Sequence, residues 1–217
     1  MNIRGILFDL DGVLISTDRL HYLAWKEVAN QLHIPFDEAE NDRLRGISRE
    51  ASLEILLERY RGPALTPAQK KLWMDRKNQL YRQMLQDLTP ASVAPDVSSA
   101  LRKLRAAGFR LALGSSSKNA RLILARTNLT DQFDAIVDGT EITHTKPDPE
   151  IYLLAASRLA LPPSSCAVVE DAETGVAAAK AGGMLSIGLG PSAAPARPDL
   201  QIRSISELPD LLVHMHP

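Results

Sequence analysis

The stretch FDLDGVLIST, residues 8–17, follows an apolar run that begins at Ile3. The run ends in Asp9, and a second carboxylate, Asp11, follows two positions later, before a glycine. Two like charges at the end of a buried strand repel each other and lose hydration, which raises their pKa values or requires a neutralising partner. The stretch therefore predicts a buried strand whose end holds a cation.

The chain after this strand shows two patterns of different period. From Asp18 to about Leu88, apolar residues recur at helical spacing, and no strand pattern interrupts them. Farther on, short apolar runs alternate with helical segments, which predicts a parallel sheet covered by helices and joined by right-handed crossovers. The helical stretch is then an insertion after the first strand. The expected strands are 109–114, 135–138, 167–170, 185–189 and 200–203, and the expected helices between them are 96–107, 118–127, 149–159 and 174–181.

Composition excludes several classes of protein. With Lys+Arg 25 against Asp+Glu 26, the net charge of -1 gives no general attraction to nucleic acid or anionic lipid. No stretch approaches ~18 uninterrupted apolar residues, and the N-terminus lacks a cleavage-site pattern, so we expect neither a membrane span nor export. The single Cys166 is expected to be a buried structural thiol. We therefore expect a monomeric, cytoplasmic protein with no nucleic-acid or membrane partner.

Polar residues follow the apolar runs at four places. Ligands of open parallel sheets bind beyond the carboxyl ends of the strands, so these places are candidate site residues. Acidic side chains hold a hard divalent cation, whereas hydroxyls, backbone N–H groups and an ammonium hold a phosphate. The predicted ligand is a phosphorylated molecule with Mg²⁺. The four places are Asp9 with Asp11, GSSSKN at 114–119, Lys146 in HTKPDPE, and Glu170 with Asp171.

Each place also has a purely structural interpretation. Serines are common helix caps, and a loop lysine is normally solvated. Glu170 and Asp171 could simply offset a helix dipole. Only the joint occurrence of all four at one sheet edge favours a binding site.

The spacing of the acids indicates chemical roles. Asp9 as a nucleophile would attack phosphorus and form an aspartyl phosphate. Asp11, two residues on, can lie on the same side and exchange a proton with the oxygen that leaves or arrives. Mg²⁺ held by Asp9, Asp171 and the Asp11 carbonyl would screen the two anions, and Lys146 would cancel further charge.

The sequence resembles the haloacid dehalogenase superfamily of phosphotransferases. DLDGV, the hydroxyl after the second strand, the KPDP lysine and the ED pair match its four motifs. The segments HYLAWK, LRGISREASLE, DRKNQLY and SSSKN resemble those of the β-phosphoglucomutase family within it, with the weakest likeness at 59–72 and after Gly190. The resemblance implies a Rossmann-like parallel-sheet core, residues 1–15 and 89–217, and a small all-helical cap domain, residues 16–88.

The resemblance also implies residue roles. Asp9 would be the phosphorylated nucleophile and Asp11 the general acid and base. The other implied sets are metal binding by Asp9, Asp11, Glu170 and Asp171; binding of the transferring phosphate by Ser115, Ser116 and Lys146; binding of the distal phosphate and sugar by Arg45, Arg49, Ser52, Ser117, Lys118 and Asn119; and cap closure by Thr17, His21 and Lys77.

Two of these residues also have interpretations that do not depend on the family. Lys77 falls on an apolar helical stripe, so it either faces a polar crevice or extends its ammonium along the surface to water. His21 lies near a helix start, where a packed neutral imidazole is the default. Departures from the family pattern are Arg45 in place of lysine, Ser16 in place of an acid and Ser116 in place of a small apolar residue, and they could shift the sugar preference.

Two enzymatic functions remain open. The first is an isomerase that converts β-D-glucose 1-phosphate to glucose 6-phosphate through the aspartyl phosphate, with β-glucose 1,6-bisphosphate as intermediate and activator. It needs a second phosphate subsite, which Arg49 and Lys118 would supply. The alternative is a sugar-phosphate phosphatase, in which water takes the phosphoryl group from Asp9. A signalling receiver domain is disfavoured because the second strand ends in GSSS and offers no aspartate, and a nucleotide-binding protein because no complete glycine-rich phosphate motif is present.

Overall fold

The computed structural model of the protein describes residues 2–44, 47–213 and 215. Its chain forms two compact units, a core unit of Met1–Ser16 with Leu88–Pro217 and a cap unit of Thr17–Asp87. Ser16 and Leu88 thus belong to the core unit, whereas we expected both in the cap.

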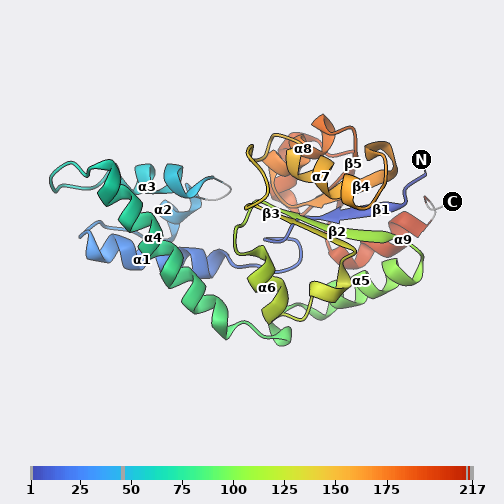
Figure 1. The fold of residues 1–217 in the computed structure, drawn as a ribbon, viewed down its shortest axis with the longest axis horizontal. Helices are drawn as coiled ribbons and strands as arrows, with labels where there is room; N and C mark the ends of the chain where they lie inside the picture. Colours follow the sequence, from blue (N-terminus) through green and yellow to red (C-terminus); the bar gives the residue numbers. More distant parts are fainter. Residues whose placement is uncertain (1, 45–46, 214, 216–217) are drawn as a thin grey trace. The chain divides into compact units, whose positions relative to one another are not determined.

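The core unit contains a six-stranded parallel sheet in the order β3-β2-β1-β4-β5-β6 (Figure 1). The parallel sheet predicted from the alternating pattern is confirmed. From the central β1 the chain builds two strands on one side, then crosses to build three on the other, so the order reverses between β1 and β4. Ligands of such sheets bind at this reversal. The strands are β1 (Gly5–Phe8), β2 (Arg110–Ser115), β3 (Ala135–Asp138), β4 (Cys166–Glu170), β5 (Leu185–Leu189) and β6 (Leu200–Ile202).

Helices cover both faces of the sheet, as Figure 1 shows. One face packs against α7 (Glu150–Arg158) and α8 (Glu173–Ala181), and the other carries α5 (Pro95–Ala106), α6 (Ala120–Arg126) and α9 (Leu208–Val213). All residues of β1 and β4 are buried, as expected for parallel strands covered on both faces. The short 3-10 helices of this unit are η2 (Pro90–Ser92), η3 (Thr130–Gln132), η4 (Pro163–Ser165), η5 (Pro191–Ala196) and η6 (Ile205–Glu207).

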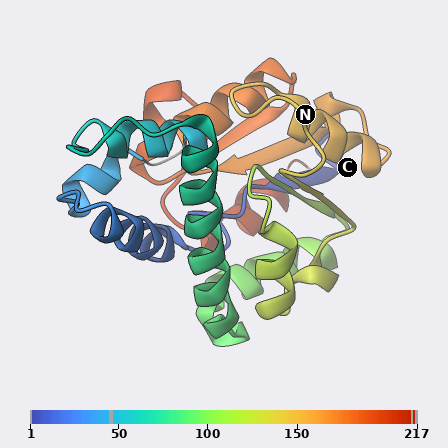
Figure 2. The same ribbon diagram turned by 60° about the vertical axis from the view of Figure 1, so that its left-hand side comes forward.

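The cap unit consists of helices with a core of its own. Trp25, Val28 and Leu53 belong to this buried cluster. The longest helix begins with a capping box, in which Thr66 accepts from the backbone N–H of Gln69 and the Gln69 side chain accepts from the backbone N–H of Thr66. Figure 2 shows it as one continuous helix. The helices are α1 (Asp18–Gln31), α2 (Glu38–Asp42), α3 (Arg49–Leu57) and α4 (Pro67–Met84), followed by η1 (Leu85–Asp87).

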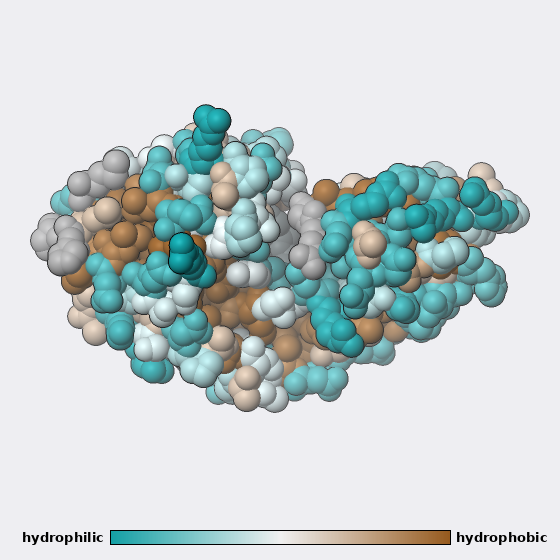
Figure 3. All heavy atoms as spheres, turned by 180° about the vertical axis from the view of Figure 1, so that it is seen from behind, coloured by the Kyte–Doolittle hydropathy of each residue, from teal (hydrophilic) through white to brown (hydrophobic). Residues whose placement is uncertain are grey.

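The surface carries few large apolar side chains. Among the described residues these are Ile47, Leu72, Leu153 and Val213, which lie in different segments of the chain. The cap surface seen on the right of Figure 3 is mostly hydrophilic. No helix in the described ranges has the length and apolar character needed to cross a membrane.

Candidate active site

Three of the predicted residues meet where the sheet order reverses. The Nζ of Lys146 donates to Oδ1 of Asp9 at 2.5 Å and to Oε1 of Glu170 at 2.6 Å. Asp9 follows β1 directly, and Glu170 is the last residue of β4. Strand β4 pairs with β1 in the sheet. The topology therefore brings together carboxylates that lie far apart in the sequence, and the lysine neutralises part of their charge.

Tyr152 is a member of this cluster that sequence reasoning missed. Its hydroxyl donates to Oε1 of Glu170 at 2.6 Å, and its ring lies 4.8 Å from Nζ of Lys146. A detectable signal existed, because Tyr152 lies on the buried face of α7, and a buried tyrosine hydroxyl needs a polar partner. Glu170 is only 1% exposed, so Lys146, Tyr152 and the backbone N–H of Ala172, which donates to Oε2 at 3.2 Å, replace water.

Burial dominates the electrostatics of the nucleophile. Burial, together with the charges of Glu170 and Asp11, raises the pKa of the Asp9 carboxyl to about 8, because Lys146 offsets these effects only in part. Burial alone would lower the pKa of Lys146, but Asp9 and Glu170 more than reverse this, so the pKa lies above its usual range. The site thus holds more acids than one ammonium can neutralise.

The acids fit a hard divalent cation. Asp9, Glu170 and Asp171 each offer an oxygen within 4.8 Å of the others, and carboxylate oxygens are the donors that Mg²⁺ prefers. Two glycines make room for them. A Cβ at Gly12, whose φ is +79°, would lie 1.9 Å from Oδ2 of Asp171, and one at Gly175 would lie 1.8 Å from Oε1 of Glu170.

A second acidic cluster serves a different purpose. His144, Asp148 and Glu150 also lie within 4.8 Å of one another by their ligand atoms. The Glu150 carboxylate, however, already accepts from the backbone N–H groups of Thr143 and His144, and Asp148 accepts from the backbone N–H of Glu150. These bonds shape the turn that begins α7.

The serines after β2 bond within their own loop. Ser115 is buried, and its Oγ accepts from the backbone N–H of Ser117 at 3.2 Å. The Oγ of Ser117 accepts in turn from the backbone N–H of Asn119, which precedes α6. Ser116 and Lys118 are exposed. The N-cap residue of α6 is Asn119 and not a serine.

Lys77 is buried in the cap unit and does not extend to water. It is 3% exposed, and its Nζ donates to Nδ1 of His21 at 2.7 Å. The ammonium also lies 4.7 Å from the ring of Tyr81 and 5.5 Å from that of Trp25, within range of cation–π attraction. Thr17 completes this group, since its Oγ1 and the Tyr81 hydroxyl are 2.9 Å apart.

His21 is the neutral packed imidazole that its position predicted. Its ring lies 4.1 Å from that of Tyr81. Burial, with the charges of Lys77 and Arg49, lowers the pKa of His21 to about 3. The ring therefore accepts a hydrogen bond at neutral pH.

The remaining cap residues make contacts inside the cap. The Nη2 of Arg49 donates to Oδ1 of Asn78 at 3.0 Å, and the buried Ser52 donates its hydroxyl to the carbonyl of Ser48. Arg45 lies outside the described residues. Their roles toward a substrate stay predictions.

The fold and site define a class of protein. The chain belongs to the haloacid dehalogenase-like hydrolase family, whose family model matches residues 3–183, and it is an enzyme of this superfamily. The predicted resemblance is thereby confirmed. Membership implies a divalent metal cofactor, typically Mg²⁺, which agrees with the acids described above.

Within this class the chain is similar to particular enzymes. It is 43% identical to the β-phosphoglucomutase of Bacillus subtilis (strain 168) over 212 residues, covering 97% of this chain and 94% of the relative. It is 32% identical to a phosphorylated carbohydrates phosphatase of Thermotoga maritima, covering 83% and 82%. The crystal structure of β-phosphoglucomutase from Clostridium difficile has a TM-score of 0.84 at 32% identity and covers 95% and 93%.

Proposed function

We propose that the protein interconverts β-D-glucose 1-phosphate and glucose 6-phosphate through an aspartyl phosphate and a β-glucose 1,6-bisphosphate intermediate. The observation that carries the proposal is the bonding of Lys146 to both Asp9 and Glu170, in a chain 43% identical to a β-phosphoglucomutase along 97% of its length. The similarity thus includes the cap unit as well as the core.

The chemistry uses a small number of groups. In the first transfer the free hydroxyl of β-glucose 1-phosphate attacks the phosphorus of the aspartyl phosphate while Asp11 takes its proton, which releases the Asp9 carboxylate and forms the bisphosphate. The bisphosphate then turns around, a carboxylate oxygen of Asp9 attacks the other phosphorus, the bond from that phosphorus to the sugar oxygen breaks, and Asp11 gives that oxygen a proton, which releases glucose 6-phosphate. Lys146 balances the charge of the transferring group. A divalent cation bound by Asp9, Asp171 and the Asp11 carbonyl, with Glu170 nearby, would reduce the repulsion between the two anions.

The other implied residues would bind or enclose the sugar phosphate. The transferring phosphate would contact Ser115 and Ser116 as well as Lys146. The distal phosphate and the sugar would contact Arg45, Arg49, Ser52, Ser117, Lys118 and Asn119, and cap closure would involve Thr17, His21 and Lys77.

One incubation tests the proposal. The protein is mixed with β-glucose 1-phosphate, Mg²⁺ and a trace of β-glucose 1,6-bisphosphate, and both glucose 6-phosphate and free phosphate are measured. We expect glucose 6-phosphate without free phosphate. Stoichiometric release of phosphate would reject the mutase and support the second candidate, a sugar-phosphate phosphatase. The 32% identity to the Thermotoga maritima phosphatase favours that alternative.

The second subsite is tested by Arg49→Ala. A mutase must bind both phosphates of the intermediate, so this variant should lower kcat/KM for the bisphosphate by about tenfold or more. Hydrolysis of a small aryl phosphate, which has a single phosphate, should be unaffected. Arg76→Ala is the matched control, because Arg76 lies in the same unit and, among the described residues, bonds to Gln79 of its own helix alone. Equal losses on both substrates would contradict a two-subsite enzyme.

A further inference from the structure

The loop between β2 and α6 is attached to the end of β3 along its whole length. At its start, Ser115 pairs with Asp138 in the β2–β3 ladder. In its middle, the carbonyl of Ser117 accepts from the backbone N–H of Gly139 at 3.3 Å. At its end, Arg121 in the first turn of α6 bonds to Asp138 through Nε and Oδ2 at 2.9 Å. Asp138, the last residue of β3, and Gly139, which follows it, therefore contact three successive parts of the segment from the end of β2 to the first turn of α6.

Gly139 is required for the middle contact. A Cβ at this position would lie 2.1 Å from the carbonyl oxygen and 2.8 Å from the carbonyl carbon of Ser116. These are backbone atoms, which cannot rotate away as a side chain can. Any other residue at position 139 would push the loop off the end of β3.

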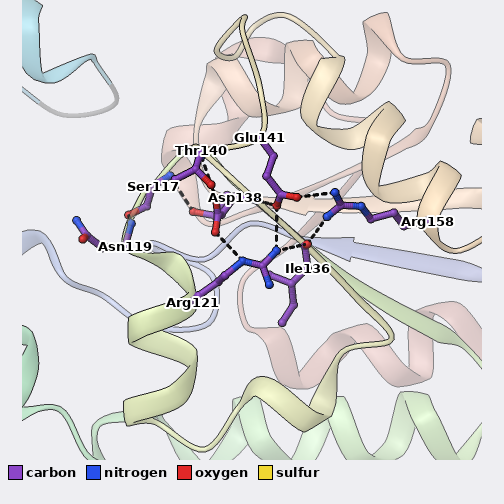
Figure 4. Close-up of polar contacts among 9 residues, drawn as sticks. Ser117, Asn119, Arg121, Ile136, Asp138, Thr140, Glu141 and Arg158 are labelled. Carbon is purple, nitrogen blue, oxygen red and sulfur yellow. Dashed lines mark hydrogen bonds and ion pairs between the residues drawn. The ribbon is translucent and has the colours of Figure 1, made fainter.

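Asp138 is a buried carboxylate, and both of its oxygens have hydrogen-bond or ion-pair partners. It is 2% exposed, and its Oδ1 accepts from the backbone N–H of Thr140 at 2.9 Å and from the Thr140 hydroxyl at 2.5 Å. Its Oδ2 pairs with Arg121, as Figure 4 shows. A buried charge is tolerated only when it is paired and hydrogen-bonded. The pair therefore fixes the first turn of α6 against the end of β3.

A second arginine lies in the same cluster but does not contact the loop. Arg158 of α7 donates to the carboxylate of Glu141 and to the carbonyl of Ile136 (Figure 4). Arg121 also donates to both of these residues, through Nη2. The two arginines thus share their structural partners, and Arg121 alone of the two makes the Asp138 ion pair.

We propose that Arg121, Asp138 and Gly139, together called the loop anchor, are positioning residues for phosphate binding by the loop from Ser115 to Asn119. They hold its hydroxyls and N–H groups in one arrangement before the ligand arrives. Ordering a loop on binding costs affinity, so a loop that is ordered beforehand binds more tightly. The inference rests on the proposed function to the extent that this loop binds a phosphate.

The test compares Arg121→Met with Arg158→Met. The measurements are the Kd of inorganic phosphate with saturating Mg²⁺, KM and kcat for β-glucose 1-phosphate, and the thermal midpoint. Both variants lose bonds to Glu141 and Ile136, and Arg121→Met also leaves the buried Asp138 carboxylate without its cation, so we expect the thermal midpoint to drop in both and to drop more in Arg121→Met. Arg121→Met should raise the phosphate Kd and the KM by about tenfold, whereas Arg158→Met should change both less than about twofold. Arg121→Lys, which keeps a charge beside Asp138, should recover part of the affinity.

Equal effects of the two substitutions on phosphate affinity would overturn the inference. Gly139→Ala provides an independent arm if Arg121→Met does not fold, because it leaves the ion pairs in place. It should also weaken phosphate binding by about tenfold, and an unchanged phosphate Kd in a folded Gly139→Ala protein would overturn the inference. If the wild-type protein binds phosphate but does not isomerise the sugar, the proposed mutase function is refuted. The proposal for the loop anchor is then still tested by the phosphate Kd values of the variants. A wild type that does not bind phosphate would overturn both.

Discussion

Asp9 has its carboxylate at the buried end of a strand, where hydration is lost. Lys146 supplies one positive charge, yet the pKa of Asp9 still rises to about 8. A carboxylate must be ionised to act as a nucleophile, so the site needs more positive charge than the chain provides. Asp171 and Glu170 lie beside Asp9 with carboxylate oxygens within 4.8 Å, so the three acids would hold a divalent cation that supplies this charge.

Asp9→Asn should remove phosphoryl transfer without harming the fold. A neutral amide is not a nucleophile toward phosphorus, so the loss should be at least about 10³-fold. Because burial disfavours the charged carboxylate, the metal-free variant should be at least as heat-stable as the wild type at pH 7. The measurements are phosphoryl transfer and the thermal midpoint. A folded Asp9→Asn protein with normal turnover would contradict the covalent mechanism.

His21 predicts an acid sensitivity of the cap unit. Its folded pKa of about 3 lies below the ordinary 6.5, so protonation opposes folding. Its contribution to stability is therefore complete above pH 6.5 and is lost as the pH falls from 6.5 toward 3, with a slope of up to about 1.4 kcal/mol per pH unit. Urea unfolding followed by fluorescence measures this directly, since Trp25 and Trp73 both belong to the cap.

Two variants isolate the histidine. His21→Gln keeps a hydrogen-bond acceptor for Lys77 but does not titrate, so the slope between pH 6.5 and 3 should flatten. His33→Gln replaces an exposed histidine of the same unit and should leave the slope as in the wild type. If both substitutions changed the slope equally, the buried imidazole could not be its source.

At the scale of elements, helix α8 contains a glycine for a reason unrelated to helix stability. Gly175 lies inside the helix, where alanine would favour the helix by about 1 kcal/mol. A Cβ there would meet the Glu170 carboxylate at 1.8 Å, and that carboxylate is held by Lys146 and Tyr152. Glycine at position 175 therefore lowers the stability of the helix but leaves space for the Glu170 carboxylate.

Gly175→Ala should therefore reduce activity more than stability. Glu170 would have to move and break its bonds, so turnover should fall by about tenfold or more, while the gain in helix propensity offsets much of the packing cost. Gly182→Ala is the matched control, because the nearest atoms to its Cβ lie at 3.4 Å and its φ is -78°. Turnover at saturating Mg²⁺ and the urea midpoint are measured for both. A fully active Gly175→Ala protein would show that Glu170 can relax without consequence.

At the scale of the whole molecule, the order of the chain creates the site. Strands β1 and β4 are neighbours in the sheet, although more than half the chain separates them. The carboxyl ends of these two strands lie where the strand order reverses. A metal ion or phosphate bound there contacts residues after β1 and residues after β4, which are far apart in the sequence. Binding there should stabilise the folded chain as a unit.

Metal and phosphate should together raise the thermal midpoint. A ligand that binds only the folded state at 100 times its Kd stabilises it by about 2.7 kcal/mol. We expect Mg²⁺ to raise the midpoint and inorganic phosphate to raise it further, and Asp171→Asn to abolish the part that depends on Mg²⁺. Differential scanning calorimetry with and without a chelator checks this. A shift of the same size in Asp171→Asn would place the metal elsewhere.

By itself, the sequence determined the fold class and most of the site. Short apolar runs and helical spacing are local properties, and their alternation predicted a parallel sheet. The rule that ligands bind at strand ends then placed Asp9, Lys146 and Glu170 at one edge of that sheet. The capping box of α4 is likewise local, because Thr66 and Gln69 lie three residues apart.

Only the tertiary structure decided which side chains touch. The burial of Lys77, the hydroxyl of Tyr152 on Glu170 and the contact of Gly139 with Ser116 join residues that no sequence period relates. Such contacts depend on distances of a few ångströms between separate elements, which are set by packing after the elements form. That is the physical reason why the sequence could locate the site but could not supply its supporting contacts.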